Sequence, residues 1–125
     1  MSTLKTSNIQ DTSGGNNSTP AEISQGRAKA WINFDGTSAS IGSGRDNFNV
    51  DTVTDNGTGA YTVTFTNNMA NANYVVVITT NMSASNSNAA YVRIDSQATS
   101  NFVVRTIHSG QFQDVSIICV AVFGD

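Results

Sequence analysis

The chain has 125 residues, of which 12% are charged, and its formal net charge is −3 at pH 7. Its six lysines and arginines are scattered along the sequence, whereas a nucleic-acid surface needs clustered basic residues, so we expect no nucleic-acid partner. No apolar run is long enough to cross a bilayer, so we also expect no membrane insertion.

Uncharged polar residues dominate the composition. Asparagine, serine and threonine each occur fifteen times, beside ten glycines and one proline. These residues disfavour long helices and favour strands with polar faces that are joined by turns. The length suits one core, so we divide the chain into an N-terminal arm over residues 1–26 and one β-domain over residues 27–125.

The N-terminal residues are polar and rich in glycine, asparagine and serine. Such a segment does not bury enough apolar surface to offset the entropy lost on ordering it. We interpret it as an extended arm that docks on another chain, with a simple linker as the alternative. The first twenty residues lack the apolar core of a signal peptide, so we expect synthesis in a cytoplasm.

The first predicted strand covers residues 28–35, where apolar and polar residues alternate. Its core-facing residues are Ala28, Ala30, Ile32 and Phe34. Trp31 then lies on the opposite face, where its ring needs cover from another subunit or from a second core layer of the same chain. A turn at Asp35-Gly36, a short strand over residues 37–41 and a loop over residues 42–44 are predicted next.

The middle of the chain carries the clearest strand signals. Phe48, Val50 and Val53 mark one strand or two short ones before a turn at Asn56-Gly57. Residues 61–66 alternate strictly, which turns Tyr61, Val63 and Phe65 toward one face. Met69 anchors a polar connection, and residues 74–78, apolar on both faces, are predicted to form a central strand.

The C-terminal third is also strand-like. Strands are predicted over residues 90–96, with Tyr91, Arg93 and Asp95 on one face, and over residues 101–108. After a turn at Ser109-Gly110, residues 112–123 are predicted to form one long strand that is apolar on both faces from Val115 onward. About eight strands with short turns predict an all-β antiparallel sandwich.

Apolar outer faces predict an oligomer, because the outer faces of a lone sandwich are usually wet. We assign four residues to a subunit interface: Trp31, Val115, Ile117 and Cys119. Cys119 is the one cysteine, so it forms no internal disulfide, and its apolar neighbours indicate a buried, unreactive thiol.

Signals of catalysis are weak. His108 is the one histidine, and the acid pairs among Asp46, Asp51 and Asp55 lie in turn-rich sequence, where aspartate bonds its own backbone. No phosphate loop or calcium loop matches the glycines and acids present. We therefore expect no catalytic residues, no metal, no cofactor and no enzymatic activity.

Binding is the better-supported chemistry, and it points to two loops, over residues 83–88 and 108–113. The candidate receptor-binding residues are Ser85, Asn86, Asn88, His108, Gln111, Phe112 and Gln113. Amides beside an aromatic ring suit the hydroxyls and ring faces of carbohydrates. The alternative is that both loops only connect strands.

The turn over residues 55–59, the strand over residues 61–66, Met69 and the following Ala72-Asn73-Tyr74 form one motif. This motif resembles a domain that recurs in tail-fibre proteins of bacteriophages, especially phages of marine cyanobacteria. Residues 27–37 resemble that domain's opening strand, residues 48–50 fit before the turn, and residues 2–11 resemble a leader peptide of short phage fibre proteins.

The resemblance implies a homotrimeric, non-enzymatic tail-fibre or tail-tip protein of the virion that is made in the host cytoplasm. Its role would be adhesion to a bacterial surface receptor, such as a glycan. The arm would attach to other virion tail or fibre proteins through Leu4 and Ile9. A purely structural adaptor or decoration protein without a receptor is the alternative, and a hydrolase that degrades host polysaccharide is a third reading.

Overall fold

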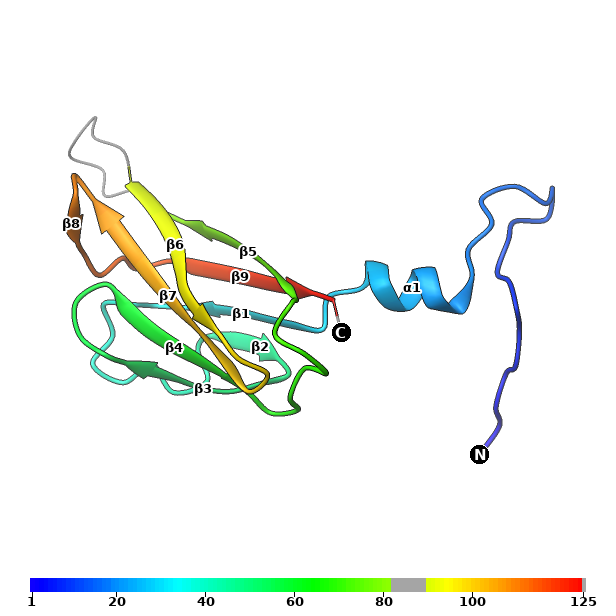
Figure 1. Cartoon of the computed structure of the whole chain (residues 1–125), viewed down its shortest axis with the longest axis horizontal. Coiled ribbons are helices and arrows are strands. Elements are labelled where there is room, and N and C mark those ends of the chain that lie inside the picture. Colours follow the sequence, from blue (N-terminus) through cyan, green and yellow to red (C-terminus); the bar gives the residue numbers. More distant parts are fainter. Residues whose placement is uncertain (82–89, 125) are drawn as a thin grey trace.

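The computed structural model describes residues 1–81 and 90–124. Across these residues the chain forms nine strands and one short helix, and the strands make two antiparallel sheets that pack face to face (Figure 1). The predicted all-β antiparallel sandwich is therefore confirmed.

The first sheet has the strand order β2-β1-β9-β5. Its strands are β1 (Ala30–Phe34), β2 (Asp46–Phe48), β5 (Val75–Thr80) and β9 (Ile118–Phe123). As predicted, Ala30, Ile32 and Phe34 are buried, and Trp31 lies on the opposite face. The prediction was wrong for Ala28, which lies before β1 and is only half-buried, because the strand begins at Ala30.

The second sheet has the order β3-β4-β7-β6, and β8 pairs with the end of β7. Its strands are β3 (Val50–Asp55), β4 (Ala60–Phe65), β6 (Ala90–Gln97), β7 (Asn101–His108) and β8 (Gln111–Phe112). Residues 48–50 thus mark two short strands, and these two strands belong to different sheets. Tyr61, Val63 and Phe65 are buried, as their alternation predicts.

The core lies between the sheets and is built around aromatic rings. Phe34 of the first sheet meets Tyr61 of the second edge to face, with ring centroids 5.3 Å apart. The Tyr61 hydroxyl lies 2.7 Å from a carboxylate oxygen of Asp114, to which it donates. Burial, followed by the nearby Asp114 carboxylate, raises the pKa of Tyr61 far above its ordinary value. Tyr61 is therefore a neutral structural tyrosine that links the two sheets.

The strand after Tyr74 is an edge strand, which corrects its prediction as a central one. β9 pairs with β1 on one side and with β5 on the other, so the sheet ends at β5. The outward side chains of Val75 and Val77 are 60% and 50% exposed. An edge strand that keeps apolar residues on both faces has the same sequence pattern as a central strand.

The predicted long final strand is also wrong, because the chain changes sheets within it. β8 belongs to the second sheet and β9 to the first, and residues 113–117 connect them. Asp114 in this connection accepts hydrogen bonds from the Gly59 amide and the Tyr61 hydroxyl, both at 2.7 Å. These bonds hold the connection between the layers instead of in a strand ladder.

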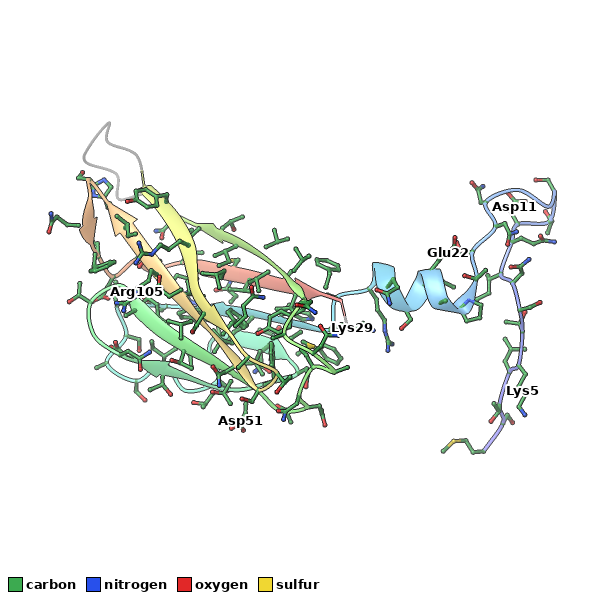
Figure 2. All side chains as sticks on the ribbon, in the orientation of Figure 1. Lys5, Asp11, Glu22, Lys29, Asp51 and Arg105 are labelled. Carbon is green, nitrogen blue, oxygen red and sulfur yellow. The ribbon has the colours of Figure 1, made fainter. Side chains whose placement is uncertain are left out.

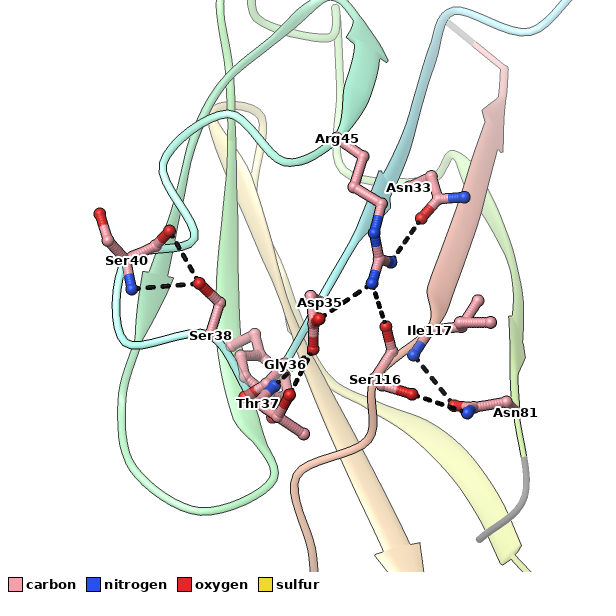
Figure 3. A network of polar contacts seen from close by, with 11 residues as sticks. Asn33, Asp35, Gly36, Thr37, Ser38, Ser40, Arg45, Asn81, Ser116 and Ile117 are labelled. Atoms are coloured by element: carbon pink, nitrogen blue, oxygen red, sulfur yellow. Dashed lines mark hydrogen bonds and ion pairs between the residues drawn. The ribbon is translucent and has the colours of Figure 1, made fainter. Parts of the chain in front are cut away.

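Residues 37–41 form a loop instead of the predicted short strand. A carboxylate oxygen of Asp35 accepts from the Thr37 amide at 2.9 Å and from its hydroxyl at 2.6 Å, which closes a turn. Arg45 then ties the loop to β1 and to the connection before β9, since its guanidinium donates to Asn33, Asp35 and the Ser116 carbonyl (Figure 3). Local side-chain bonds outcompete strand pairing here.

The N-terminal segment lies outside the two sheets and includes a helix that we did not predict, α1 (Pro20–Gly26). Thr19 and Glu22 form a reciprocal capping box, and Pro20 occupies the first turn. The Thr-Pro-x-Glu sequence was the available signal. Among the described residues, no helix has the length and apolar character required to cross a membrane.

Candidate functional site

The hairpin between β7 and β8 lies at the far end of the sandwich from the N-terminal segment (Figure 1). Its two loop residues, Ser109 and Gly110, have φ of 53° and 76°. Two successive residues with positive φ make the tight hairpin turn that matches the twist of paired strands. This turn brings Phe112 beside Ile107, its register partner on β7.

Two aromatic rings flank Ile107 on the outer face of the second sheet. Ile107 pairs with Tyr91 on β6 and with Phe112 on β8, so the three residues form one row across the sheet. Tyr91 is 51% exposed and Phe112 is 47% exposed, whereas Ile107 between them is only 5% exposed. The two rings therefore cover Ile107 and offer apolar surface to solvent.

Two arginines and one aspartate lie next to this row, on the same face. Arg93 and Arg105 are register partners on β6 and β7, and Asp95 lies where the register of β6 shifts. One carboxylate oxygen of Asp95 accepts from Arg93 Nε and the other from Arg105 Nε, each at 2.7 Å. A bulge that redirects one side chain thus allows a single carboxylate to hold two guanidinium groups.

The guanidinium groups also lie over the Phe112 ring. Arg105 Cζ is 4.9 Å and Arg93 Cζ is 5.9 Å from the ring centroid, within the range of cation–π attraction. We call the five residues Tyr91, Arg93, Asp95, Arg105 and Phe112 the tip cluster. Figure 2 labels Arg105 on the sandwich, at a distance from Lys5 and Asp11 of the N-terminal segment.

The hydrogen bond from Arg105, followed by that from Arg93, lowers the pKa of Asp95 below its ordinary value. We predict that wild type and Asp95→Asn differ in stability by a constant amount at neutral pH. The two should converge as the pH falls below about 4, because a group with a lowered folded pKa loses its contribution when it is protonated. Urea unfolding at a series of pH values measures this, and a difference that does not shrink as the pH falls below about 4 contradicts the ion pairs.

The structure brings part of the predicted receptor-binding set to this end of the molecule. Gln111 and Phe112 are exposed, Gln113 is half-buried, and its carbonyl accepts from the Thr106 hydroxyl. The Nε2 atom of His108 is buried and finds no hydrogen-bond partner among the described residues. Ser85, Asn86 and Asn88 lie outside the described residues.

Four members of the tip cluster were not among the predicted site residues: Tyr91, Arg93, Asp95 and Arg105. The alternation of residues 90–96 placed the first three on one face, which was the available signal. The pairing with Arg105 depends on the register between β6 and β7, and that register has no local sequence signal.

Two rows on the outer face of the first sheet are apolar, and the row beside them contains Asp46, Asn33, Cys119 and Thr79. Register pairs place Phe48, Trp31, Ala121 and Val77 in one row across all four strands, with Phe123 and Val75 in the next row. We call these six residues the apolar outer face. Phe48 is 54% and Trp31 37% exposed, whereas Ala121 and Phe123 are half-buried, so the described part of the chain leaves this face partly uncovered.

The outer face of the second sheet is different. Beyond the tip cluster it carries threonines in register across β3 and β4: Thr52, Thr54, Thr62 and Thr64. Such a face is compatible with water. Only one of the two outer faces is therefore aromatic and aliphatic across its whole width.

The predicted interface residues are divided by the structure. Trp31 is in the apolar outer face, but Val115 is 8% exposed and packs in the core, so its side chain is not available to a partner. Ile117 is exposed in the connection before β9, where its backbone bonds Asn81 (Figure 3). Cys119 is half-buried in a row with Asn33 and Thr79, next to the apolar outer face.

The predicted attachment residues lie in the N-terminal segment. Leu4 and Ile9 are 85% and 52% exposed, and Ile9 pairs with Ser18 in an isolated bridge. Together with Ile23 of α1 they line an open cleft of about 600 Å³. The apolar residues of this segment therefore share one surface.

Across residues 1–81 and 90–124, no three His, Cys, Asp or Glu side chains gather as a metal site would require. No family model, curated protein or solved structure matches the chain.

Proposed function

We propose that the chain is a non-enzymatic tail-fibre or tail-tip protein of a bacteriophage virion, made in the host cytoplasm, that assembles as a homotrimer and adheres to a bacterial surface glycan. The apolar outer face carries this proposal. An apolar row that spans four strands and stays partly uncovered in a single chain is typical of a subunit interface. The assignment to a phage virion and to three subunits comes from the resemblance to phage tail fibres.

The unprotected edge of β5 also supports association with copies of the same chain. Edge strands usually carry charges, prolines or bulges that block pairing with other molecules. β3 and β6 each have acidic or basic residues and a register shift, and β2 has only three residues. β5 has none of these features, because Val75–Thr80 contains only valine, isoleucine and threonine in regular register.

The two ends of the molecule support a division of labour. The N-terminal segment leaves one end of the sandwich, and the tip cluster lies toward the other (Figure 1). In the proposed arrangement the segment attaches to other virion tail or fibre proteins through Leu4 and Ile9, and the tip cluster faces the host. Several weak sites on one rigid particle then bind together, with a gain of about a hundredfold or more over one site.

Retention on bacterial cells tests the proposal. Fluorescent full chain is incubated with a panel of cyanobacterial and other bacterial strains, and its molar mass is measured by light scattering. We expect an oligomer that is retained on at least one strain. An oligomer that no strain retains contradicts adhesion and favours a structural adaptor, and a 13.2 kDa monomer contradicts the fibre assignment itself.

A further inference from the structure

We propose that the tip cluster binds a sugar that carries an anionic group, with the anion on the arginines and the sugar ring against the exposed aromatic side chains. This ligand class rests on the adhesive function proposed above and specifies which kind of glycan the site would recognise. Each part of the site supplies one part of the recognition.

The arginines are oriented and still have donors to offer. Asp95 takes the Nε of Arg93 and the Nε of Arg105, which fixes both planes. The Nη groups of both arginines make no hydrogen bond with the described residues. Two guanidinium groups against one carboxylate leave a local charge of +1 in a chain of net charge −3. Planar guanidinium groups with unused donors are suited to binding a carboxylate or phosphate in a bidentate manner.

The two aromatic rings give the site an apolar surface, which a site for a simple anion would not require. Tyr91 and Phe112 remain about half exposed on either side of Ile107, and that surface is apolar. Sugar rings present apolar C–H faces that pack on aromatic rings, while their hydroxyls need donors and acceptors at the rim. The Tyr91 hydroxyl provides one such group, because Tyr91 lies on the same face as Phe112 and is half exposed.

The site is held by backbone geometry in addition to its side chains. The turn at Ser109-Gly110 sets the position of Phe112, and the β6 bulge sets the direction of Asp95. The bound form therefore needs little rearrangement of the five residues, which reduces the entropy lost on binding.

Titration of ¹⁵N-labelled full chain with small probes tests the inference, because arginine Nε–H signals and the amides of β6–β8 report on the site directly. The probes are D-glucuronate, D-glucose, acetate and D-glucose 6-phosphate. Glucose has the ring without the anion, and acetate has the anion without the ring. We expect saturable shifts at the tip cluster with glucuronate, and at least tenfold weaker binding of both glucose and acetate. The phosphate sugar shows which anion the arginines prefer.

Substitutions locate the effect. Arg93→Gln, which removes the more exposed arginine, is expected to weaken glucuronate binding at least tenfold, and Phe112→Ala is expected to do the same. Arg27→Gln removes one exposed positive charge next to α1, so it is the matched control and should leave the affinity unchanged. Melting temperatures of all variants show whether each one is folded.

The outcomes separate this inference from the proposed function. Equal affinity for acetate and glucuronate, equal affinity for glucose and glucuronate, or shifts away from β6–β8 would each overturn the acidic-sugar site. Cells that retain wild type and Arg93→Gln equally would overturn it as well, while leaving adhesion intact. If glucuronate binds as expected but the chain is monomeric and no strain retains it, the proposed function fails and the site stands.

Discussion

Gly59→Ala is expected to destabilise the sandwich by about 3 kcal/mol, the largest loss we predict for a single added methyl group. Gly59 has φ of +64°, where a side chain costs about 1–2 kcal/mol. Its added Cβ would also lie 2.5 Å from the Thr106 carbonyl oxygen and 2.8 Å from the Gln113 amide nitrogen. Both are backbone atoms, so relief requires movement of β7 or of the connection after β8, and overpacking of this kind costs about 1–3 kcal/mol.

Gly110→Ala is the matched control for that prediction. Gly110 has a similar φ of +76°, but nothing lies within 4 Å of its added Cβ. The Gly110→Ala variant should therefore lose only about 1 kcal/mol of unfolding free energy, which is the cost of positive φ for a residue with a side chain. Urea unfolding of both variants measures the difference. Equal losses would contradict the close approach of Gly59 to the backbone after Phe112, and with it the placement of the hairpin that presents the tip cluster.

Local periodicity was sufficient to predict two central strands of the second sheet. The alternation of residues 61–66 and 101–108 corresponds closely to β4 and β7, and it places Tyr61, Val63, Phe65, Phe102 and Val104 inside, where they are buried. Ile107 is the exception, because it is buried on the outer face beside Tyr91 and Phe112. These strands have one dry and one wet face, so their sequence pattern has one interpretation. The turn at Ser109-Gly110 was equally readable, because serine and glycine are common turn residues and glycine adopts positive φ without a steric cost.

Position within a sheet was not predictable in the same way. Residues 74–78 were predicted to form a central strand because they are apolar on both faces, yet β5 is at the edge of its sheet. A sequence records that a face is apolar but not whether the same chain or another chain covers it. The sequence also did not predict that the chain changes sheets between β8 and β9. The hydrogen bonds of Asp114 that position this connection involve residues 53 and 55 positions away in the chain, so they leave no local sequence signal.

The candidate site was predictable only in part. Phe112 followed from the composition of a turn, and one face of β6 followed from alternation. The joining of these pieces into one cluster depends on three strands, β6, β7 and β8, and on a bulge at Asp95. Non-local register of this kind is set by the packing of the whole sheet. A single sequence therefore indicates which residues are available but not that they lie together.

Val77→Lys is expected to dissociate the assembled protein while leaving the subunit folded. Val77 is at the end of the row that contains Trp31, on an exposed edge strand, so a lysine there is tolerated in a single chain. In an interface built on the apolar outer face, the same lysine brings a charge into an apolar contact. We expect the dissociation constant to rise at least about thirtyfold, which corresponds to roughly 2 kcal/mol, the order of the cost of placing an unpaired polar group in an apolar contact.

Thr54→Lys supplies the control for this experiment. Thr54 is an exposed outward residue on β3, the corresponding edge strand of the second sheet, so the substitution adds the same charge to the face that we expect to stay wet. Sedimentation velocity over a range of concentrations should show Val77→Lys as a monomer where wild type and Thr54→Lys remain assembled. If Val77→Lys assembles as tightly as wild type, the subunits meet elsewhere, and the apolar outer face loses its role in the proposed fibre. If both lysine variants dissociate, the effect is one of net charge, and the face-specific interface is again contradicted.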